Sequence, residues 1–278
     1  MNMSSPIKDL NRLCVHTIST KPLKFEEACL KYAEYGIKGI SIWRDAVEGI
    51  SPQKVIDGLK VNGLTAVSYV RGGFFPSVNE DRRRAAIADN LQMLQEAAEM
   101  EIPLLVLVCG SDPGQSLQTS RDQIQQGIEG ILAEARRLGV RLAIEPLHPM
   151  YADTRSAITS LKQANDMAEY FNDETLGIAV DVYHLWFDDR LEEQIYRCGK
   201  NHNLYAFHIS DWNVPTTDML NDRGLMGEGC IPLKQIRGWV EKAGFSGFRE
   251  VEIFSEKFWS LDQDLFLKKI IDAYRNHS

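Results

Sequence analysis

A carboxylate and an imidazole lie three residues apart in the apolar stretch Gly177–Trp186, as Asp181 and His184. Asp181 ends a run of strand-forming residues, and the mouth of a buried strand is a place where a carboxylate can hold a metal ion with the substrate beside it. A buried aspartate that accepts backbone hydrogen bonds, next to a packed histidine, would give the same pattern. The interpretation therefore depends on whether other strands bring matching groups to the same place.

The elements around this stretch repeat a pattern of amphipathic helix, glycine and apolar strand. Apolar residues at helical spacing, such as Ile124 and Ile128, predict the helices, and glycines such as Gly63 and Gly139 stand where a left-handed residue ends a helix. The predicted strands are Arg12–His16, Gly39–Trp43, Leu64–Val70, Leu104–Cys109, Arg141–Glu145, Leu176–Asp181, Leu204–Ile209 and Phe248–Ile253. Eight apolar strands alternating with helices predict an α/β protein, a single (β/α)₈ TIM-barrel domain over residues 1–278.

The main alternative to a barrel is a doubly wound open sheet. Such a sheet usually has a glycine-rich phosphate loop after its first strand, and the corresponding junction here, Val15–Thr20, contains no glycine. The longest irregular segment, Ser210–Ile231, is predicted to be an active-site loop.

Ionisable residues stand at the ends of the last four predicted strands, where a barrel enzyme carries its chemistry. They are Glu145, Asp181, His208 and one of Glu250 and Glu252, which point the same way along their strand. Burying these groups without partners would be costly in free energy. One divalent cation removes that cost, and the mostly oxygen ligand set suits Mn²⁺ or Mg²⁺, with Zn²⁺ and Co²⁺ as alternatives.

Other side chains are candidates for contacting a substrate. The spacing of His184 from Asp181 favours a place in the site, and His148 lies just past a strand end, where it could contact substrate or donate a proton. His16, at the end of the first strand, is a lesser candidate. The candidates for lining the pocket from the early strands are Trp43, Arg44, Arg71 and Phe74.

Composition restricts the class of protein. The 278 residues are 44% hydrophobic and carry a formal net charge of −8, which argues against binding to nucleic acid or to an anionic membrane. No run approaches the roughly 18 apolar residues of a membrane span, and Met1–Pro6 has no signal-peptide core, so a cytoplasmic protein is expected.

The five cysteines show no CxxC spacing and are expected to be reduced and buried. Phe258 and Trp259 are expected to be exposed, either at a homo-oligomer contact or as a cap on the pocket.

The strand-end residues lie in motifs that resemble the xylose isomerase-like TIM-barrel superfamily, in particular its sugar phosphate isomerase and epimerase group. The motifs are Ile144–Pro146, Val180–His184, Phe207–Asp211, Asp222–Gly229 and Val251–Phe254. The strand–helix order extends the resemblance over nearly the whole chain.

The resemblance implies a role for each matching residue. Glu145, Asp181, His208 and Glu252 would bind one divalent metal ion, Mn²⁺ in the first instance, which favours Glu252 over Glu250. Glu145 and Glu252 would also be the catalytic acid and base, on opposite sides of the substrate carbon. His184 and Arg223 would hold substrate oxygens, whereas His148, the other predicted substrate contact, stands where the epimerase pattern has a different polar residue.

Three functions follow from these residues. The leading hypothesis is a metal-dependent sugar isomerase or epimerase that abstracts a proton next to a carbonyl and passes through an enediolate. The second is a lyase or dehydratase acting on an inosose or 3-keto glycoside, which His148 could support as an acid. The third is a hydrolase like the superfamily's three-zinc endonucleases, but that site needs histidines at early strand ends, where Trp43 and Arg71 stand. The segment Trp212–Asn221 is longer than in the epimerase pattern, which leaves the choice of sugar open.

Overall fold

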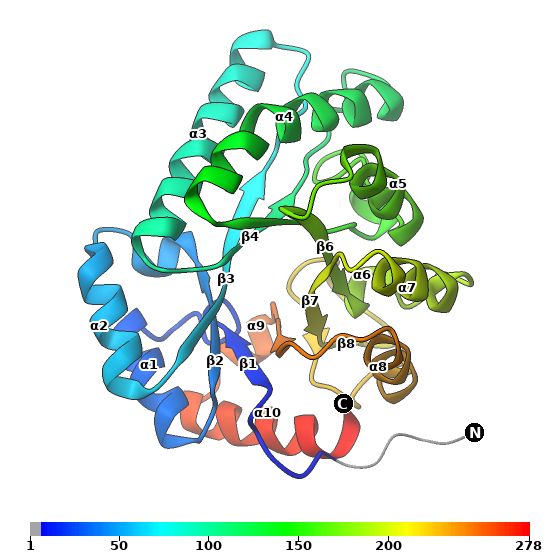
Figure 1. The fold of residues 1–278 in the computed structure, drawn as a ribbon. Coiled ribbons are helices and arrows are strands. Elements are labelled where there is room, and N and C mark those ends of the chain that lie inside the picture. Colours follow the sequence, from blue (N-terminus) through cyan, green and yellow to red (C-terminus); the bar gives the residue numbers. More distant parts are fainter. Residues whose placement is uncertain (1–6) are drawn as a thin grey trace.

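A closed parallel β-barrel forms the centre of the molecule (Figure 1). The computed structural model describes residues 7–278, so Met1–Pro6 lies outside the described residues. Within them the barrel contains eight strands, in the spatial order β1-β10-β7-β6-β5-β4-β3-β2. Their bounds are β1 (Leu13–His16), β2 (Gly39–Trp43), β3 (Thr65–Gly73), β4 (Leu104–Val108), β5 (Arg141–Ile144), β6 (Leu176–Asp181), β7 (Leu204–Ile209) and β10 (Arg249–Val251).

Helices surround the barrel, and Figure 1 shows them as a ring outside the strands. The longer ones are α1 (Phe25–Glu34), α2 (Pro52–Asn62), α3 (Glu80–Glu99), α4 (Leu117–Leu138), α5 (Leu161–Phe171), α7 (Leu191–Lys200), α8 (Leu233–Lys242) and α10 (Gln263–His277). Single helical turns are α6 (Val182–Leu185) and α9 (Glu256–Trp259), with short 3₁₀ turns η1 (Arg44–Val47) and η2 (Pro149–Tyr151). None of these helices in residues 7–278 has the length and apolar character needed to cross a membrane.

The predicted barrel is confirmed, and the open-sheet alternative is wrong. Glycines end two of the helices as expected: Gly63 caps α2 with φ 62° and Gly139 caps α4 with φ 70°, left-handed conformations that glycine adopts without steric cost. Two details differ from the prediction. Strand β3 continues to Gly73, and the loop 210–231 contains a short antiparallel pair, β8 (Asp211–Trp212) and β9 (Arg223–Gly224).

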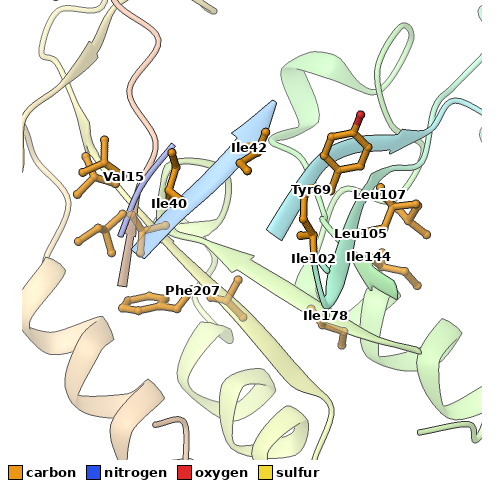
Figure 2. Close-up of a cluster of buried hydrophobic side chains, with 14 of the residues drawn as sticks. Val15, Ile40, Ile42, Tyr69, Ile102, Leu105, Leu107, Ile144, Ile178 and Phe207 are labelled. Atoms are coloured by element: carbon orange, nitrogen blue, oxygen red, sulfur yellow. The ribbon is translucent and has the colours of Figure 1, made fainter. Parts of the chain in front are cut away.

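Strand side chains alternate between two apolar layers. Those that face outward join the helices in one large core, and Figure 2 shows several of them, including Val15, Ile40, Leu105 and Phe207. Those that face inward form a separate, smaller cluster: Val70, Leu104, Val106, Ala143, Ala179 and Ala206. Small residues inside the barrel leave room for polar side chains above them, at the carboxyl ends of the strands.

Two expectations about individual side chains are wrong. Phe258 is buried and stacks on Phe266, with ring centroids 4.7 Å apart, because α9 folds back onto α10. It therefore offers no surface for a subunit contact. The five cysteines are free, and four are buried as expected, but Cys230 is exposed because it lies in the loop that follows β9.

Candidate metal and catalytic site

Four ionisable side chains meet at the mouth of the barrel. Glu145 follows β5, Asp181 ends β6, His208 lies in β7, and Glu252 follows β10. One potential ligand atom from each lies within 4.8 Å of those of the other three, and all four residues are buried. The structure thus brings together the four residues predicted from the strand ends.

The register of the strands explains this convergence. Asp181 pairs with His208 across β6 and β7, and His208 pairs with Glu250 across β7 and β10. Glu250 therefore lies level with His208, and Glu252, two residues further along on the same face, reaches the mouth. This difference in depth decides which of the two glutamates joins the cluster.

The cluster has the chemistry and spacing of a site for one divalent cation. His208 Nδ1 lies 3.0 Å from Glu145 Oε1 and 3.8 Å from Glu252 Oε2. Ligand atoms bound to one ion at about 2.0–2.2 Å lie roughly 3–4 Å apart, so small side-chain shifts would let all four reach a common ion. Three carboxylates and one imidazole form a mixed oxygen and nitrogen set that accepts Mn²⁺, Zn²⁺ or Co²⁺.

Arg223 links two of the carboxylates. Its Nη1 donates to Asp181 Oδ2 at 3.0 Å and to Glu252 Oε2 at 2.9 Å, and its Nη2 lies 3.1 Å from His184 Nε2. The guanidinium also lies over the ring of Tyr183, with Cζ 4.3 Å from the centroid. The arginine that follows the long loop is thus held in place by the same groups that form the cluster.

A second set of buried polar groups lies beneath the cluster. Glu250 accepts hydrogen bonds from Ser41 Oγ at 2.6 Å and Ser68 Oγ at 3.1 Å, and its Oε2 lies 3.2 Å from His16 Nε2. The same oxygen lies 3.7 Å from His208 Nε2. Glu250 therefore connects His16 and His208 from below. The two serines could not be predicted from the sequence, because a serine in an apolar strand does not indicate which distant residue it will bind.

Burial and charge set the protonation states of the cluster. Burial opposes a charge on His208, but Glu250, Glu145 and Glu252 outweigh it and raise the pKa of His208 to about 10. Burial likewise disfavours a charged Glu252. Arg223, His16 and His208 nevertheless hold the pKa of Glu252 well below its usual range. Burial raises the pKa of Asp181 to about 7, against the opposing effect of Arg223.

The pKa values of two histidines beside the cluster shift in opposite directions. Burial would lower the pKa of His16, but Glu252 and Glu250 raise it; the distance from His16 Nδ1 to Glu252 Oε1 is 3.3 Å. Burial and the nearby Arg223 lower the pKa of His184 well below its ordinary value, so its ring is neutral. Because Nε2 faces an Arg223 donor, the proton of His184 belongs on Nδ1. Nδ1 has no hydrogen-bond partner within residues 7–278.

His148 lies away from the cluster. Its ring packs between Phe187 and Trp212, with centroids 4.6 and 5.2 Å away, and its Nδ1 accepts a hydrogen bond from the Met150 amide. It is not among the residues that line the space beside the cluster. Its predicted contact with substrate stays a prediction.

Two neighbouring spaces lie beside the cluster. A chamber of about 30 Å³ is lined by Glu145, Glu252, His184 and Arg223 among others, and its volume suits a water molecule or an ion rather than a sugar. A groove of about 1040 Å³ adjoins it. The two share the residues Trp43, Arg71, Arg155, Leu220 and Phe254.

The long loop closes one side of the chamber. Leu220 lines both spaces, and the carbonyl of the preceding Met219 accepts hydrogen bonds from the hydroxyls of Tyr151 and Tyr183. Leu220 therefore lies where a sugar that enters from the groove would approach the cluster. The predicted assignment of this loop to the site agrees with its position.

The fold and the buried cluster define a (β/α)₈ barrel with a site at the carboxyl ends of its strands that can hold a divalent metal ion. The chain belongs to the xylose isomerase-like TIM barrel family, whose model matches residues 29–276.

Individual relatives extend this relationship. An inosose isomerase from Halalkalibacterium halodurans is 22% identical over 207 residues, which cover 72% of this chain and 70% of the relative. A crystal structure of protein SMc04130 from Sinorhizobium meliloti 1021 is 42% identical, with a TM-score of 0.93 and coverage of 97% of this chain and 99% of that one. A crystal structure of IolI protein with a zinc atom is 17% identical, with a TM-score of 0.79 and coverage of 94% and 96%, a likeness of fold.

Proposed function

We propose that this chain is a divalent-metal-dependent sugar isomerase or epimerase that moves a proton next to a carbonyl group. The observation that carries the proposal is that only two of the four cluster residues face the chamber. Glu145 and Glu252 line the chamber, whereas Asp181 and His208 are fully buried behind them. Two carboxylates that face one chamber can remove a proton from a substrate carbon and return one to it.

The metal ion belongs to this proposal. Glu145, Asp181, His208 and Glu252 would hold it, and we propose Mn²⁺ because three of the four ligands are carboxylates. When bound, a divalent ion stabilises the negative charge that develops on the carbonyl oxygen as the neighbouring proton leaves. The zinc atom in the IolI structure supports a divalent metal ion, and the choice of Mn²⁺ depends on the ligand set of this chain.

The remaining side chains suit the binding of sugar oxygens. Glu252 is kept ionised by Arg223 and His16, so it is ready to accept a proton. The neutral His184 lines the chamber, and its Nδ1–H, which has no partner within the described residues, is a candidate donor to a substrate oxygen. Arg223 lies beside it as a second donor.

The lyase hypothesis has less support than the isomerase. An elimination needs an acid beside the leaving group, and the residue considered for that task, His148, packs against Phe187 and Trp212 outside the chamber. The residues that line the chamber include Glu145 and Glu252, a pair of carboxylates that suits proton transfer in either direction.

Solvent exchange tests the proposed function. Ketoses, inososes and 3-keto glycosides are incubated in D₂O with protein loaded with Mn²⁺ and with protein treated with a chelator. We expect one deuterium in a recovered sugar of otherwise unchanged formula, only with the metal-loaded protein. Loss of water or of a glycosidic group would identify a lyase, and exchange that is unaffected by the chelator would contradict the metal assignment.

A further inference from the structure

Two arginines without carboxylate partners face the space beside the cluster. Arg71 and Arg155 line both the chamber and the groove. Within the described residues, neither guanidinium forms an ion pair or a hydrogen bond. Their side-chain contacts are with aromatic rings: Arg71 Cζ lies 5.4 Å from Trp43 and 5.0 Å from Phe74, and Arg155 Cζ lies 5.4 Å from Tyr151.

The backbone directs both side chains to this place. The register of β3 against β4 shifts between Val70 and Gly72, so Arg71 is the extra residue of a bulge, a feature that turns a side chain away from the regular alternation. Arg155 follows η2, and its carbonyl accepts a hydrogen bond from the amide of Gly110, just after β4. The two arginines therefore stand on either side of the end of β4.

The positive charges of the two arginines lie close enough to affect each other. Arg71 is half-buried, and its burial and the charge of Arg155 lower its pKa, although Glu252, Glu145 and Asp45 act in the opposite direction. Like charges at a partly buried site repel each other unless an anion lies between them. Arg44, which lines the same groove, is different because it pairs with Asp89 and Glu96, each at 2.7 Å.

We propose that Arg71 and Arg155 bind an anionic group of the substrate, so that the substrate is an acidic sugar derivative, either a phosphate ester or a carboxylate. This inference rests on the proposed function and adds the substrate class to it. The sugar carbon that reacts would lie in the chamber at Glu145 and Glu252, and the anionic end would lie at Arg71 and Arg155, which line both the chamber and the groove. Planar guanidinium groups suit both anions, because each can form two parallel hydrogen bonds to phosphate or carboxylate oxygens.

Matched ligands test the inference by calorimetry on Mn²⁺-loaded protein at low ionic strength. The probes are the neutral ketose D-fructose and its two anionic counterparts, D-fructose 6-phosphate and D-fructuronate. A neutral pentulose and its 5-phosphate form a second matched pair. We expect at least one anionic probe to bind about tenfold or more tightly than its neutral counterpart, on the scale of a charge-assisted contact. The anionic probe that binds more tightly than the neutral sugar shows whether the natural group is a phosphate or a carboxylate.

The variants assign the effect to the two arginines. Arg71→Gln and Arg155→Gln are each expected to reduce the preference for the anionic probe about fivefold or more, and Arg71→Lys to retain part of it. Arg137→Gln is the matched control, because Arg137 is on α4, is not among the residues that line the groove, and pairs with Glu134 at 2.6 Å; this variant should leave the preference unchanged. Equal binding of neutral and anionic probes, or a preference that survives in both glutamine variants, overturns the inference.

Proton exchange in D₂O separates this inference from the proposed function. Exchange into a neutral ketose without any anionic preference would leave the isomerase proposal standing and refute the arginine pair. A clear anionic preference without exchange into any probe would support the arginine pair and refute the isomerase.

Discussion

Proton release on metal binding is a quantitative consequence of the cluster. In the ion-free protein the pKa of His208 is raised to about 10, so at pH 7.5 its imidazole carries a proton that a metal ion must displace. The affinity for Mn²⁺ should therefore rise about tenfold for each pH unit between pH 7 and 9, since one unit of pKa corresponds to about 1.36 kcal/mol. Below pH 7 the slope should steepen, because Asp181, with its pKa raised to about 7, begins to hold a second proton.

Calorimetry in buffers with different heats of ionisation measures this release directly. About one proton per bound ion is expected at pH 8. Glu250→Gln is the informative variant, because the charge of Glu250 is the largest single contribution that raises the pKa of His208. Without this charge, the rise of Mn²⁺ affinity with pH should level off at a lower pH. An affinity that stays constant between pH 7 and 9, with no proton released, would refute the assignment of His208 as a ligand in competition with protons.

Two further predictions concern the scaffold and the loop. A methyl group on Gly127 of α4 would lie 2.3 Å from the Phe75 ring, whereas one on Gly130 would lie 3.4 Å from the nearest side chain. Gly127→Ala should therefore cost about 1–3 kcal/mol in denaturant unfolding, and Gly130→Ala should gain about 0.5–1 kcal/mol from helix propensity; equal effects would contradict the packing. Tyr183→Phe removes the hydroxyl that donates to the Met219 carbonyl at 3.2 Å. Losing about 1 kcal/mol there should increase amide exchange in the loop roughly fivefold without a change in the barrel strands, as hydrogen–deuterium exchange with mass spectrometry would detect.

The strand order and most strand ends could be predicted from sequence, because they depend on local patterns. Glu145, Asp181 and His208 each end an apolar run, and parallel strands present their carboxyl ends on one face of a barrel. The choice between Glu250 and Glu252 could not be made in this way. It depends on the stagger between neighbouring strands, which appears only when β10 is paired with β7.

Features that depend on distant partners also escaped prediction. Ser41 and Ser68 gain their role from Glu250, which lies about 200 residues further along the chain. Arg155 lies in an irregular turn, and only the fold places it near Arg71 at the bulge of β3. The sequence pattern around each residue is compatible with an ordinary surface or core position.

The central claim is that Glu145 and Glu252 move a proton at one carbon of a sugar. Its most direct test is deuterium incorporation from D₂O by Glu145→Gln and Glu252→Gln, measured at saturating Mn²⁺ with the bound metal quantified. Each variant is predicted to lose at least about 100-fold in exchange, the usual contribution of a general acid or base, while Glu256→Gln, in a residue that lines the groove, keeps the wild-type rate. Wild-type exchange in either glutamine variant at full metal occupancy would contradict the account.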